Sequence, residues 1–309
     1  MKKSLLYIAL LGIAVLFCAC NEDDLSSTSV VKESVNEPTD FDRWLEENYR
    51  APFNIRFLYR YEDVETDMSY DLTPARELYC RILAKAVRYL WLDPYTEITN
   101  AHFMRQYAPR VMMVIGSGAF NSNGTMTVGT AEGGLKITLY VGNWIEDFAT
   151  INYFNGVDET DGYSVTIDNV ERFNYYYLHT IHHEFAHILN QKIPYPTDFN
   201  AISKGDYAAQ WNTNTDADAA PLGFVSAYAS AAPGEDFVEV YSCYVSWDDA
   251  TWEAKLEEAG EEGADRIRRK LEIVKSYMQT AWNIDVEAMR ASLNRRFNDI
   301  SNIDWSNFN

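Results

Sequence analysis

The spacing of apolar residues divides the chain into a first part with strands and helices and a second part in which helices dominate. Residues 54–61 alternate between apolar and polar side chains, and Val111 to Ile115 form a short apolar run, so both are predicted strands. Two further strands are predicted at 125–130 and 136–141, joined by a glycine-containing turn at 132–134. The pattern therefore predicts a small mixed sheet in the first part of the chain.

Helical spacing occurs on both sides of these strands. A short helix is predicted at 41–49, and another begins at Pro74, which suits a first helical turn, and ends at Asp93 and Pro94. Three later segments share the spacing: 250–257, 261–281 and 285–297. An α+β fold follows, with a sheet-containing part at about 41–192 and a mostly helical part at about 193–309.

A helix in the middle of the chain carries four of the five histidines. Asp168 is its expected N-cap, Glu171 completes a capping box, and Pro194 forces its end. Its core stripe comprises four apolar residues: Leu178, Ile181, Phe185 and Ile188. His183 and His187 lie off this stripe, as a pair that lines a cleft should.

His183, Glu184 and His187 form an H-E-x-x-H motif. Residues four apart lie on one face of a helix, so two neutral imidazoles at this spacing can bind one zinc ion. Glu184 can then act as the general base on a zinc-activated water. His179 is predicted to be a structural, hydrogen-bonding residue. His182 points roughly 100° away from His183 and is not expected to bind the metal.

A third metal ligand must come from outside this motif. A metzincin would have Gly and His where this chain has Asn190 and Ile193, and no His follows His187. The third ligand of a catalytic site is therefore a carboxylate. Glu235 and Glu239, four apart on a predicted helix, suit one ligand and one partner that orients a ligand histidine. A solvated acidic face is the alternative interpretation of this pair.

Composition narrows the class of protein. The 309 residues are 47% hydrophobic, enough for one large domain or two small ones. The formal charge of −20 argues against a nucleic-acid partner, whose phosphates would be repelled. Four cysteines are too few for a disulfide scaffold, and Cys80 and Cys243 are predicted to be packing residues.

The N-terminus resembles a bacterial lipoprotein signal. Two lysines precede an apolar run from Leu5 to Phe17, which is shorter than the roughly 18 residues that a membrane-spanning helix needs. Cys20 follows small Ala19 and is the expected lipidated residue after removal of residues 1–19. An ordinary signal peptide cleaved nearby is the alternative. Residues 20–40 show no apolar period and are predicted to be a flexible tether.

Acidic residues directly after Cys20, in Asn21-Glu22-Asp23-Asp24, resemble the surface-export tag of lipoproteins from Bacteroidetes-type bacteria. This resemblance implies an outer-membrane protein that is anchored by lipid and exposed on the cell surface.

The two motif segments together resemble the gluzincin metallopeptidases, in which E-x-x-x-E or E-x-x-x-D follows H-E-x-x-H. In the branch of anthrax lethal factor and the clostridial Pro-Pro endopeptidases, the first Glu is the ligand, and a Tyr seven residues earlier polarises the scissile carbonyl. The resemblance implies that Glu235 is the ligand, Glu239 the partner that orients a ligand histidine and Tyr228 the electrophilic helper.

A closer resemblance is to zinc-metallohydrolase lipoproteins encoded near outer-membrane nutrient importers in Bacteroidetes. It rests on residues 182–191, on residues 223–229, on Asp42-Arg43-Trp44 and on the lipoprotein start. The family implies a gluzincin-like metallopeptidase domain at 41–309, one zinc per chain, a peptide or protein substrate and an importer complex as partner.

Two segments near the motif are expected to shape the cleft. In many zinc peptidases an edge strand before the motif helix pairs with an extended substrate, and the hairpin at 125–141 is placed for this role. Plain sheet structure is the alternative. Residues 194–227 are polar and irregular, which is typical of a functional loop.

The function predicted from these observations is peptide-bond hydrolysis by a zinc-activated water, with Glu184 as general base and uptake of nutrients as the setting. Two alternatives stay open. One is a non-catalytic, zinc-containing binding lipoprotein of an importer, and the other is a zinc amidohydrolase that acts on a non-peptide amide.

Overall fold

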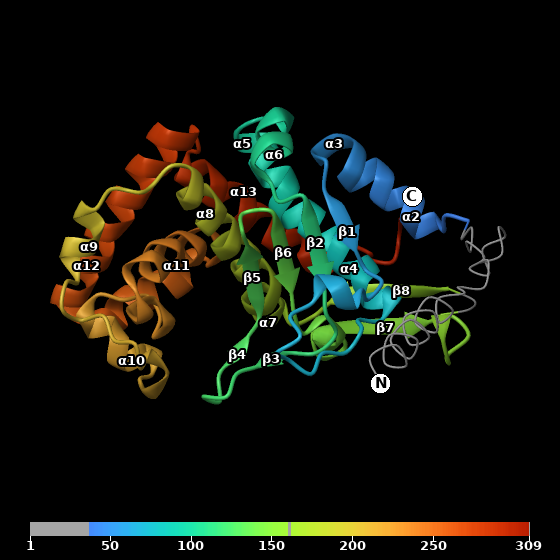
Figure 1. The fold of residues 1–309 in the computed structure, drawn as a ribbon, viewed down its shortest axis with the longest axis horizontal. Coiled ribbons are helices and arrows are strands. Elements are labelled where there is room, and N and C mark those ends of the chain that lie inside the picture. The colour runs from blue at the N-terminus through green and yellow to red at the C-terminus, as the bar shows by residue number, and fades with distance from the viewer. Residues whose placement is uncertain (1–36, 160–161, 309) are drawn as a thin grey trace, which may run out of the picture. The chain divides into compact units, whose positions relative to one another are not determined.

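The computed structural model describes residues 37–159 and 162–308, and residues from Thr39 onward form one compact unit. The predicted signal peptide, the lipidation site at Cys20 and almost all of the predicted tether lie outside the described residues. The fold is α+β, as predicted, with a small sheet before the motif helix and helices after it (Figure 1). Among the described helices, none is both long and apolar enough to cross a membrane.

The main sheet has four strands in the order β1-β2-β6-β5. Their bounds are β1 (Arg56–Leu58), β2 (Val111–Val114), β5 (Gly129–Glu132) and β6 (Lys136–Leu139). β1, β2 and β6 run parallel, whereas β5 is antiparallel to β6 and pairs Gly129 with Leu139. The mixed sheet and a hairpin are confirmed, with β5 as the edge strand of the sheet. The strand predicted at 125–130 is divided, because Met126 and Thr127 pair with residues 119–120 and the hairpin begins only at Gly129. Two antiparallel pairs complete the β-structure: β3 (Ala119–Phe120) with β4 (Met126–Thr127), and β7 (Ala149–Tyr153) with β8 (Tyr163–Ile167).

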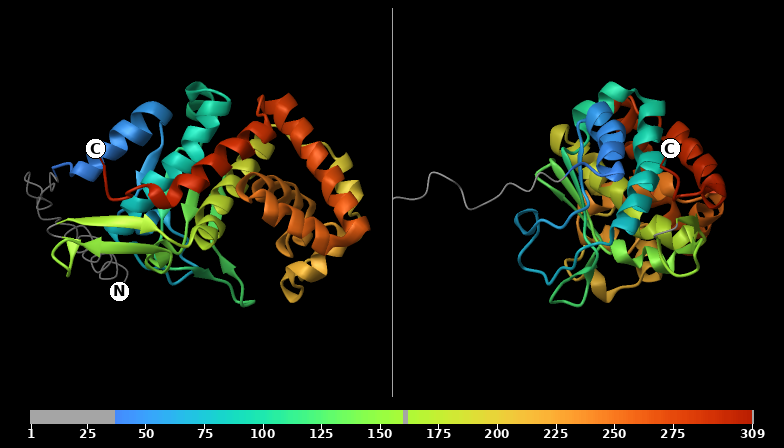
Figure 2. Two further views of the ribbon diagram at one scale, coloured as in Figure 1. Left: turned by 180° about the vertical axis from the view of Figure 1, so that it is seen from behind. Right: turned by 90° about the vertical axis from the view of Figure 1, so that its right-hand side faces the viewer.

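Helices gather on one face of the main sheet (Figure 2). Those before the strand β8 are α2 (Asp40–Leu45), η1 (Glu46–Arg50), α3 (Ala51–Phe53), α4 (Glu77–Val87), η3 (Arg88–Leu92), α5 (Asp93–Ile98) and α6 (Ala101–Tyr107). The central helix comprises α7 (Val170–Phe173), the π-helical η6 (Asn174–His179) and α8 (Thr180–Lys192). The later helices are α9 (Asp198–Ile202), α10 (Asp216–Ala219), α11 (Pro233–Ser246), α12 (Asp249–Trp282) and α13 (Val286–Asp299). The 3₁₀ turns are η2 (Asp63–Glu65), η4 (Gly142–Asp147), η7 (Trp211–Thr213), η8 (Ala220–Leu222), η9 (Tyr228–Ala231) and η10 (Ile300–Asn302).

The motif helix α8 packs between the sheet and α11. The four predicted core residues of the central helix, Leu178, Ile181, Phe185 and Ile188, are all fully buried. Gly129 on β5 lies against this helix so closely that an added Cβ would come within 2.2 Å of the Thr180 side chain. A side chain at position 129 would therefore push the edge strand away from the motif.

Several predicted helix boundaries were wrong. Pro74 forms an isolated bridge with Ile115, and the helix begins only at Glu77. Asp93 and Pro94 do not end this helical segment, because the chain continues through the π-helical turn η3 into α5. Pro94 lies in the first turn of α5, where the missing N–H of a proline is tolerated. Asp168 is not the N-cap of the central helix: the Asn169 side chain accepts from the Arg172 N–H instead.

Other departures from prediction are smaller. The strand predicted at 54–61 is limited to the three residues of β1. The segments 250–257 and 261–281 belong to the single element α12, which is interrupted at Gly260, with a φ of 66°. The loop at 194–227 contains α9, α10 and short turns, so it is less irregular than predicted.

Candidate metal centre

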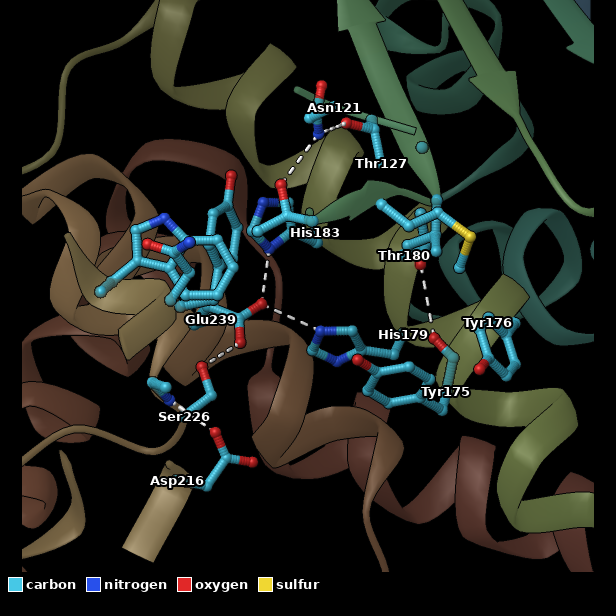
Figure 3. Close-up of a pocket in the computed structure, with 18 of the residues that line it drawn as sticks. Asn121, Thr127, Tyr175, Tyr176, His179, Thr180, His183, Asp216, Ser226 and Glu239 are labelled. Carbon is cyan, nitrogen blue, oxygen red and sulfur yellow. Dashed lines mark hydrogen bonds and ion pairs between the residues drawn. The ribbon is translucent and has the colours of Figure 1, made fainter. Parts of the chain in front are cut away.

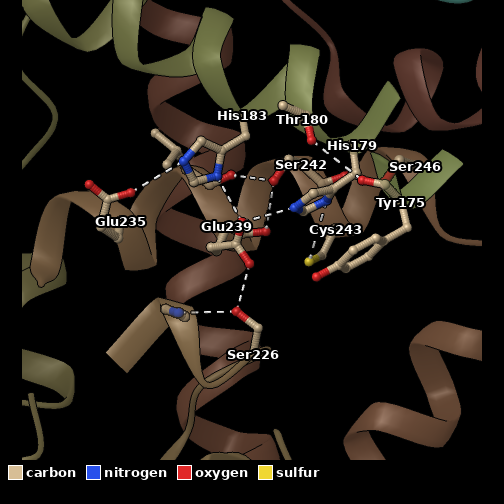
Figure 4. Close-up of polar contacts among 12 residues, drawn as sticks. Tyr175, His179, Thr180, His183, Ser226, Glu235, Glu239, Ser242, Cys243 and Ser246 are labelled. Carbon is tan, nitrogen blue, oxygen red and sulfur yellow. Dashed lines mark hydrogen bonds and ion pairs between the residues drawn. The ribbon is translucent and has the colours of Figure 1, made fainter. Parts of the chain in front are cut away.

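Helices α8 and α11 bring the predicted metal-binding side chains together, and Figure 4 shows His183 of α8 between Glu235 and Glu239 of α11. The Nε2 atoms of His183 and His187 lie 3.1 Å apart. One carboxylate oxygen of Glu235, in the first turn of α11, lies 3.2 Å from the His183 Nε2 and 3.1 Å from the His187 Nε2. Three donor atoms thus converge on one point, although His187 and Glu235 lie 48 positions apart in sequence.

The spacing of these three atoms fits a zinc ion. Ligand atoms held about 2.0–2.1 Å from one tetrahedral ion lie roughly 3.4 Å from each other. The observed triangle, with sides of 3.1 to 3.2 Å, is close to this value. Two imidazoles and one carboxylate are also the ligand set of catalytic zinc sites that keep one position open.

The hydrogen bond at the other nitrogen of His183 supports the same assignment. The His183 Nδ1 lies 2.7 Å from Glu239, whose carboxylate can only accept, so Nδ1 carries the proton. In the neutral imidazole Nε2 would then present a lone pair to the Glu235 carboxylate, so the arrangement needs either a proton on Nε2 or a metal ion between the two groups. Burial opposes the charged form, but hydrogen bonds to Glu235 and Glu239 outweigh it and raise the pKa of His183 to about 10. The centre therefore calls for positive charge, which a zinc ion provides.

Glu239 is the hydrogen-bond partner of a ligand histidine, as predicted, and it also accepts hydrogen bonds from two further residues. One oxygen accepts from the His183 Nδ1 and, at 2.9 Å, from the His179 Nε2. The other accepts from the Ser226 hydroxyl at 2.6 Å. His179 is a hydrogen-bonding residue as predicted, but the group that it holds belongs to the metal centre. Ser226 was not identified from the sequence, because nothing in its local pattern distinguishes it from other loop serines.

Replacing Ser226 by Ala should weaken zinc binding by roughly 10- to 100-fold, as is typical when a group that orients a ligand histidine is lost. Without its hydroxyl partner the Glu239 carboxylate can rotate, and the His183 imidazole follows. Competition with a chelating dye measures the affinity. Ser226→Thr should restore it, and Ser246→Ala is the matched control, because that buried hydroxyl bonds only the Ser242 carbonyl. Unchanged zinc affinity in Ser226→Ala would contradict this role.

Glu184 lies between the metal-binding residues and the edge strand. Its carboxyl group is buried and accepts from the main-chain N–H of Ala131 on β5. Burial is the main reason that the pKa of Glu184 lies above its ordinary value, although both motif histidines lower it. A carboxylate of raised pKa beside the metal-binding atoms is suited to accept a proton from water.

Tyr228 faces the centre from the turn η9. Its ring stacks on the His183 ring at 5.7 Å and meets the edge of the Trp211 ring at 4.9 Å. Burial, with the Glu235 carboxylate next in effect, raises the pKa of Tyr228, so its hydroxyl keeps its proton at neutral pH. Two hydrogen bonds hold its segment: the N–H of Ala227 donates to Asp216 and the N–H of Ala229 to Ser226.

His182 lies away from the metal centre, as predicted. It is fully buried, stacks on the Tyr95 ring at 5.7 Å and hydrogen-bonds the Leu90 carbonyl. That carbonyl lies four residues before Pro94, which has no N–H to give it. Burial lowers the pKa of His182 to about 3, so the imidazole is neutral. His182 therefore bonds the main chain near Pro94 and is not one of the described residues whose donor atoms converge.

The cysteines also behave as predicted. Cys80 and Cys243 are free and buried. Cys243 lies 3.9 Å from the His179 Nδ1, but it belongs to neither of the groups of described residues whose donor atoms converge, which are His183/His187/Glu235 and His179/His183/Glu239. In the second group both histidine nitrogens already donate to Glu239, so it is a hydrogen-bonded network.

A cleft of about 660 Å³ opens beside the metal-binding residues (Figure 3). His183 and Glu184 lie at one end, and the loop between β3 and β4, the π-helical turn η6 and the segment 211–216 form its walls. The loop predicted to shape the cleft therefore does so. Asn121 and Thr127, which hydrogen-bond each other across the β3–β4 pair, belong to the same wall.

The edge strand β5 presents free main-chain groups toward this region. The Tyr140 N–H donates to the Val128 carbonyl, and in an antiparallel ladder every second residue faces the partner strand. Gly129 and Ala131 therefore direct their polar groups away from β6, on the side where Ala131 reaches Glu184. An extended peptide can pair with such an edge.

Fold and site together are those of a zinc-binding metallo-peptidase. Residues 34–287 match the family described as "Putative zinc-binding metallo-peptidase", and the chain belongs to that family. It is similar to the crystal structure of a putative zinc-binding metallo-peptidase from Bacteroides caccae ATCC 43185, with 42% sequence identity and a TM-score of 0.70. The match covers 91% of this chain and 100% of that one. No curated protein matches the chain.

Proposed function

We propose that this protein is a zinc peptidase of gluzincin type that cleaves peptide bonds. The observation that carries the proposal is the convergence of His183, His187 and Glu235 within 3.2 Å, with Glu184 and Tyr228 on either side. Structural zinc sites have four protein ligands, whereas a site with three keeps a position for water and substrate.

Each reacting atom has a residue to serve it. Zinc held by His183, His187 and Glu235 would supply Lewis acidity, which acidifies water and polarises a carbonyl group. Glu184 accepts a proton from the water that attacks the scissile carbonyl and then passes this proton to the leaving amine. Tyr228 donates a hydrogen bond to the carbonyl oxygen as negative charge develops on it.

The substrate in this proposal is an extended peptide that lies along β5. The main-chain N–H and C=O of Gly129 and the C=O of Ala131 pair with the peptide backbone, so affinity does not depend on one side-chain sequence. The pairing also brings the scissile bond past Glu184, because Ala131 already contacts that carboxylate. A non-peptide amide lacks the backbone groups that such an edge would bind.

Tyr228→Phe should lower kcat by roughly 10²- to 10³-fold and leave KM nearly unchanged, because the lost hydrogen bond strengthens only as charge develops on the substrate oxygen. The phenylalanine ring keeps the packing against His183 and Trp211. Steady-state kinetics on one cleaved peptide measures the two constants. A rise in KM at constant kcat would instead assign Tyr228 to ground-state binding.

We further propose that the mature protein starts at Cys20, is held at the outer membrane by lipid on that residue and acts on the cell surface beside a nutrient importer. The basic and apolar signal segment, Ala19 before Cys20 and the acidic stretch after it support this placement. Mass spectrometry of the mature N-terminus tests it: a diacylglyceryl group on Cys20 is expected.

The function is tested by a peptide-library digest with purified residues 21–309, after metal analysis. Zinc-dependent cleavage between defined residues supports the peptidase. Bound zinc with no peptide cleaved would contradict it and favour the binding lipoprotein or the non-peptide amidohydrolase. Cleavage of small amides without cleavage of peptides would then favour the non-peptide amidohydrolase over the binding lipoprotein.

A further inference from the structure

The charges around the active-site cleft have one sign. Among the described residues that line the cleft, none is Lys or Arg, whereas Glu184, Asp216 and Glu239 are carboxylates. Zinc on the neighbouring site would bring two positive charges, which balance Glu235 and Glu239. Glu184 and Asp216 then remain as negative charges at the cleft.

Asp216 is the carboxylate farther from the reacting atoms, and it is anchored. Asp216 is the first residue of α10, and its side chain is exposed. Its Oδ1 accepts a hydrogen bond from the N–H of Ala227 at 2.6 Å. Ala227 immediately precedes Tyr228, so this hydrogen bond holds Asp216 at a constant distance from the proposed catalytic tyrosine. In Figure 3 its second oxygen points away from that bond.

An exposed aromatic ring lies on another wall of the same cleft. Tyr175 on η6 is 60% exposed, although its ring is parallel to the His179 imidazole, with 6.4 Å between centroids. His179 is in turn tied to Glu239. The ring is therefore supported from within and open to the cleft, and an aromatic face of this kind attracts ammonium and guanidinium groups.

We propose that this cleft is a subsite for a cationic side chain, Lys or Arg, of the peptide substrate, with Asp216 as its counter-charge and Tyr175 as the ring on which it packs. The subsite excludes acidic side chains by repulsion. Its volume of about 660 Å³ admits a long side chain together with neighbouring peptide backbone. The inference rests on the proposed function, because it assigns a substrate class to the same site.

Binding is measured without turnover, on the zinc-loaded Glu184→Gln variant. The probes are three labelled peptide pools, randomised over uncharged residues, that contain a single Lys, norleucine or Glu. Fluorescence anisotropy at low salt should show the Lys pool binding about 5- to 10-fold more tightly than the norleucine pool, and the Glu pool more weakly than either. Added salt should reduce the difference.

Two variants test the residues. Asp216→Asn keeps an oxygen to accept the Ala227 N–H and removes the charge, so the ratio of Lys to norleucine affinity should fall toward one. A displaced Tyr228 segment would weaken both pools alike and leave the ratio unchanged. Tyr175→Leu should lower the ratio about 2- to 3-fold. Asp198→Asn, in the first turn of α9 and outside the cleft, is the control that keeps the ratio.

Equal binding of the Lys and Glu pools, or a ratio retained in Asp216→Asn, overturns the inference. Failure of the proposed peptidase function would be seen in a different experiment, in which the unmodified protein with zinc cleaves no peptide. That result does not depend on which pool the Glu184→Gln variant binds more tightly.

Discussion

Replacing Glu184 by Gln is expected to leave zinc binding intact and to reduce peptide hydrolysis by roughly 10²- to 10⁴-fold, the range of a lost general base. Glutamine has nearly the same shape and keeps an oxygen that can accept the Ala131 N–H. It has no carboxylate to take a proton from water. Glu184 is not one of the three converging donor residues, so the metal site should not change.

Metal content and kcat should be measured on the same preparation of this variant. Full zinc with kcat near background is the expected result. Glu132→Gln is a useful comparison, because that carboxylate lies at the end of β5 and pairs with Lys136 at 3.0 Å, away from the motif. Retained peptidase activity in Glu184→Gln would refute the assigned role.

Replacing Lys270 by Met is expected to cost roughly 3–5 kcal/mol of unfolding free energy, because it leaves a buried carboxylate without its counter-charge. Lys270 on α12 and Asp236 on α11 are both fully buried, with 2.6 Å between Nζ and the Asp236 oxygen. Lys270 also donates to the Gly223 carbonyl at 2.7 Å, and Tyr207 donates to Asp236 at 2.8 Å. Burial raises the pKa of Asp236 to about 6 and lowers that of Lys270, which shows how unfavourable the site is for charge.

Urea denaturation of metal-free protein measures this effect. The double variant Lys270→Met/Asp236→Asn should recover part of the loss, because no unpaired charge remains. Lys275→Met is the matched control on the same helix: Lys275 pairs with the 57%-exposed Glu287, and its loss should cost about 1 kcal/mol or less. A double variant that is destabilised by the sum of the two single effects would show that the pair is not coupled.

The Lys270–Asp236 pair has a functional neighbour. Asp236 follows Glu235 directly, so the pair fixes the first turn of α11, which presents the third metal-binding group. Sequence did not identify it, because Lys270 lies 34 positions further along the chain and nothing local links the two residues.

The local part of the site could be predicted from sequence. Two histidines four apart on a helix must lie on one face, and so must Glu235 and Glu239. The structure brings His183, His187 and Glu235 to one point, with Glu239 at the other ring nitrogen of His183 and Tyr228 against its ring. Helical periodicity was sufficient to pair these residues, because it depends on neighbours within a turn or two, whereas the choice of Glu235 as ligand and of Tyr228 as helper came from the family resemblance.

What the sequence could not supply came from contacts over long distances. Ser226, Asp216 and Tyr175 gain their roles from a hydrogen bond or a cavity that only the folded chain creates. The predictions of helix ends were wrong for a similar reason. Pro94 normally marks a boundary, but a π-helical turn and the donor from His182 accommodate it, and that donor lies 92 positions from Leu90.

The proposed peptidase activity is expected to depend on one zinc ion held by His183, His187 and Glu235. Titration of metal-free protein with zinc, with cleavage of one library-derived peptide as the readout, tests it most directly. Cleavage should rise linearly, reach a plateau at one zinc per chain and stay at background throughout in His187→Ala. Cleavage before any zinc is added, or none at saturation, would contradict the account.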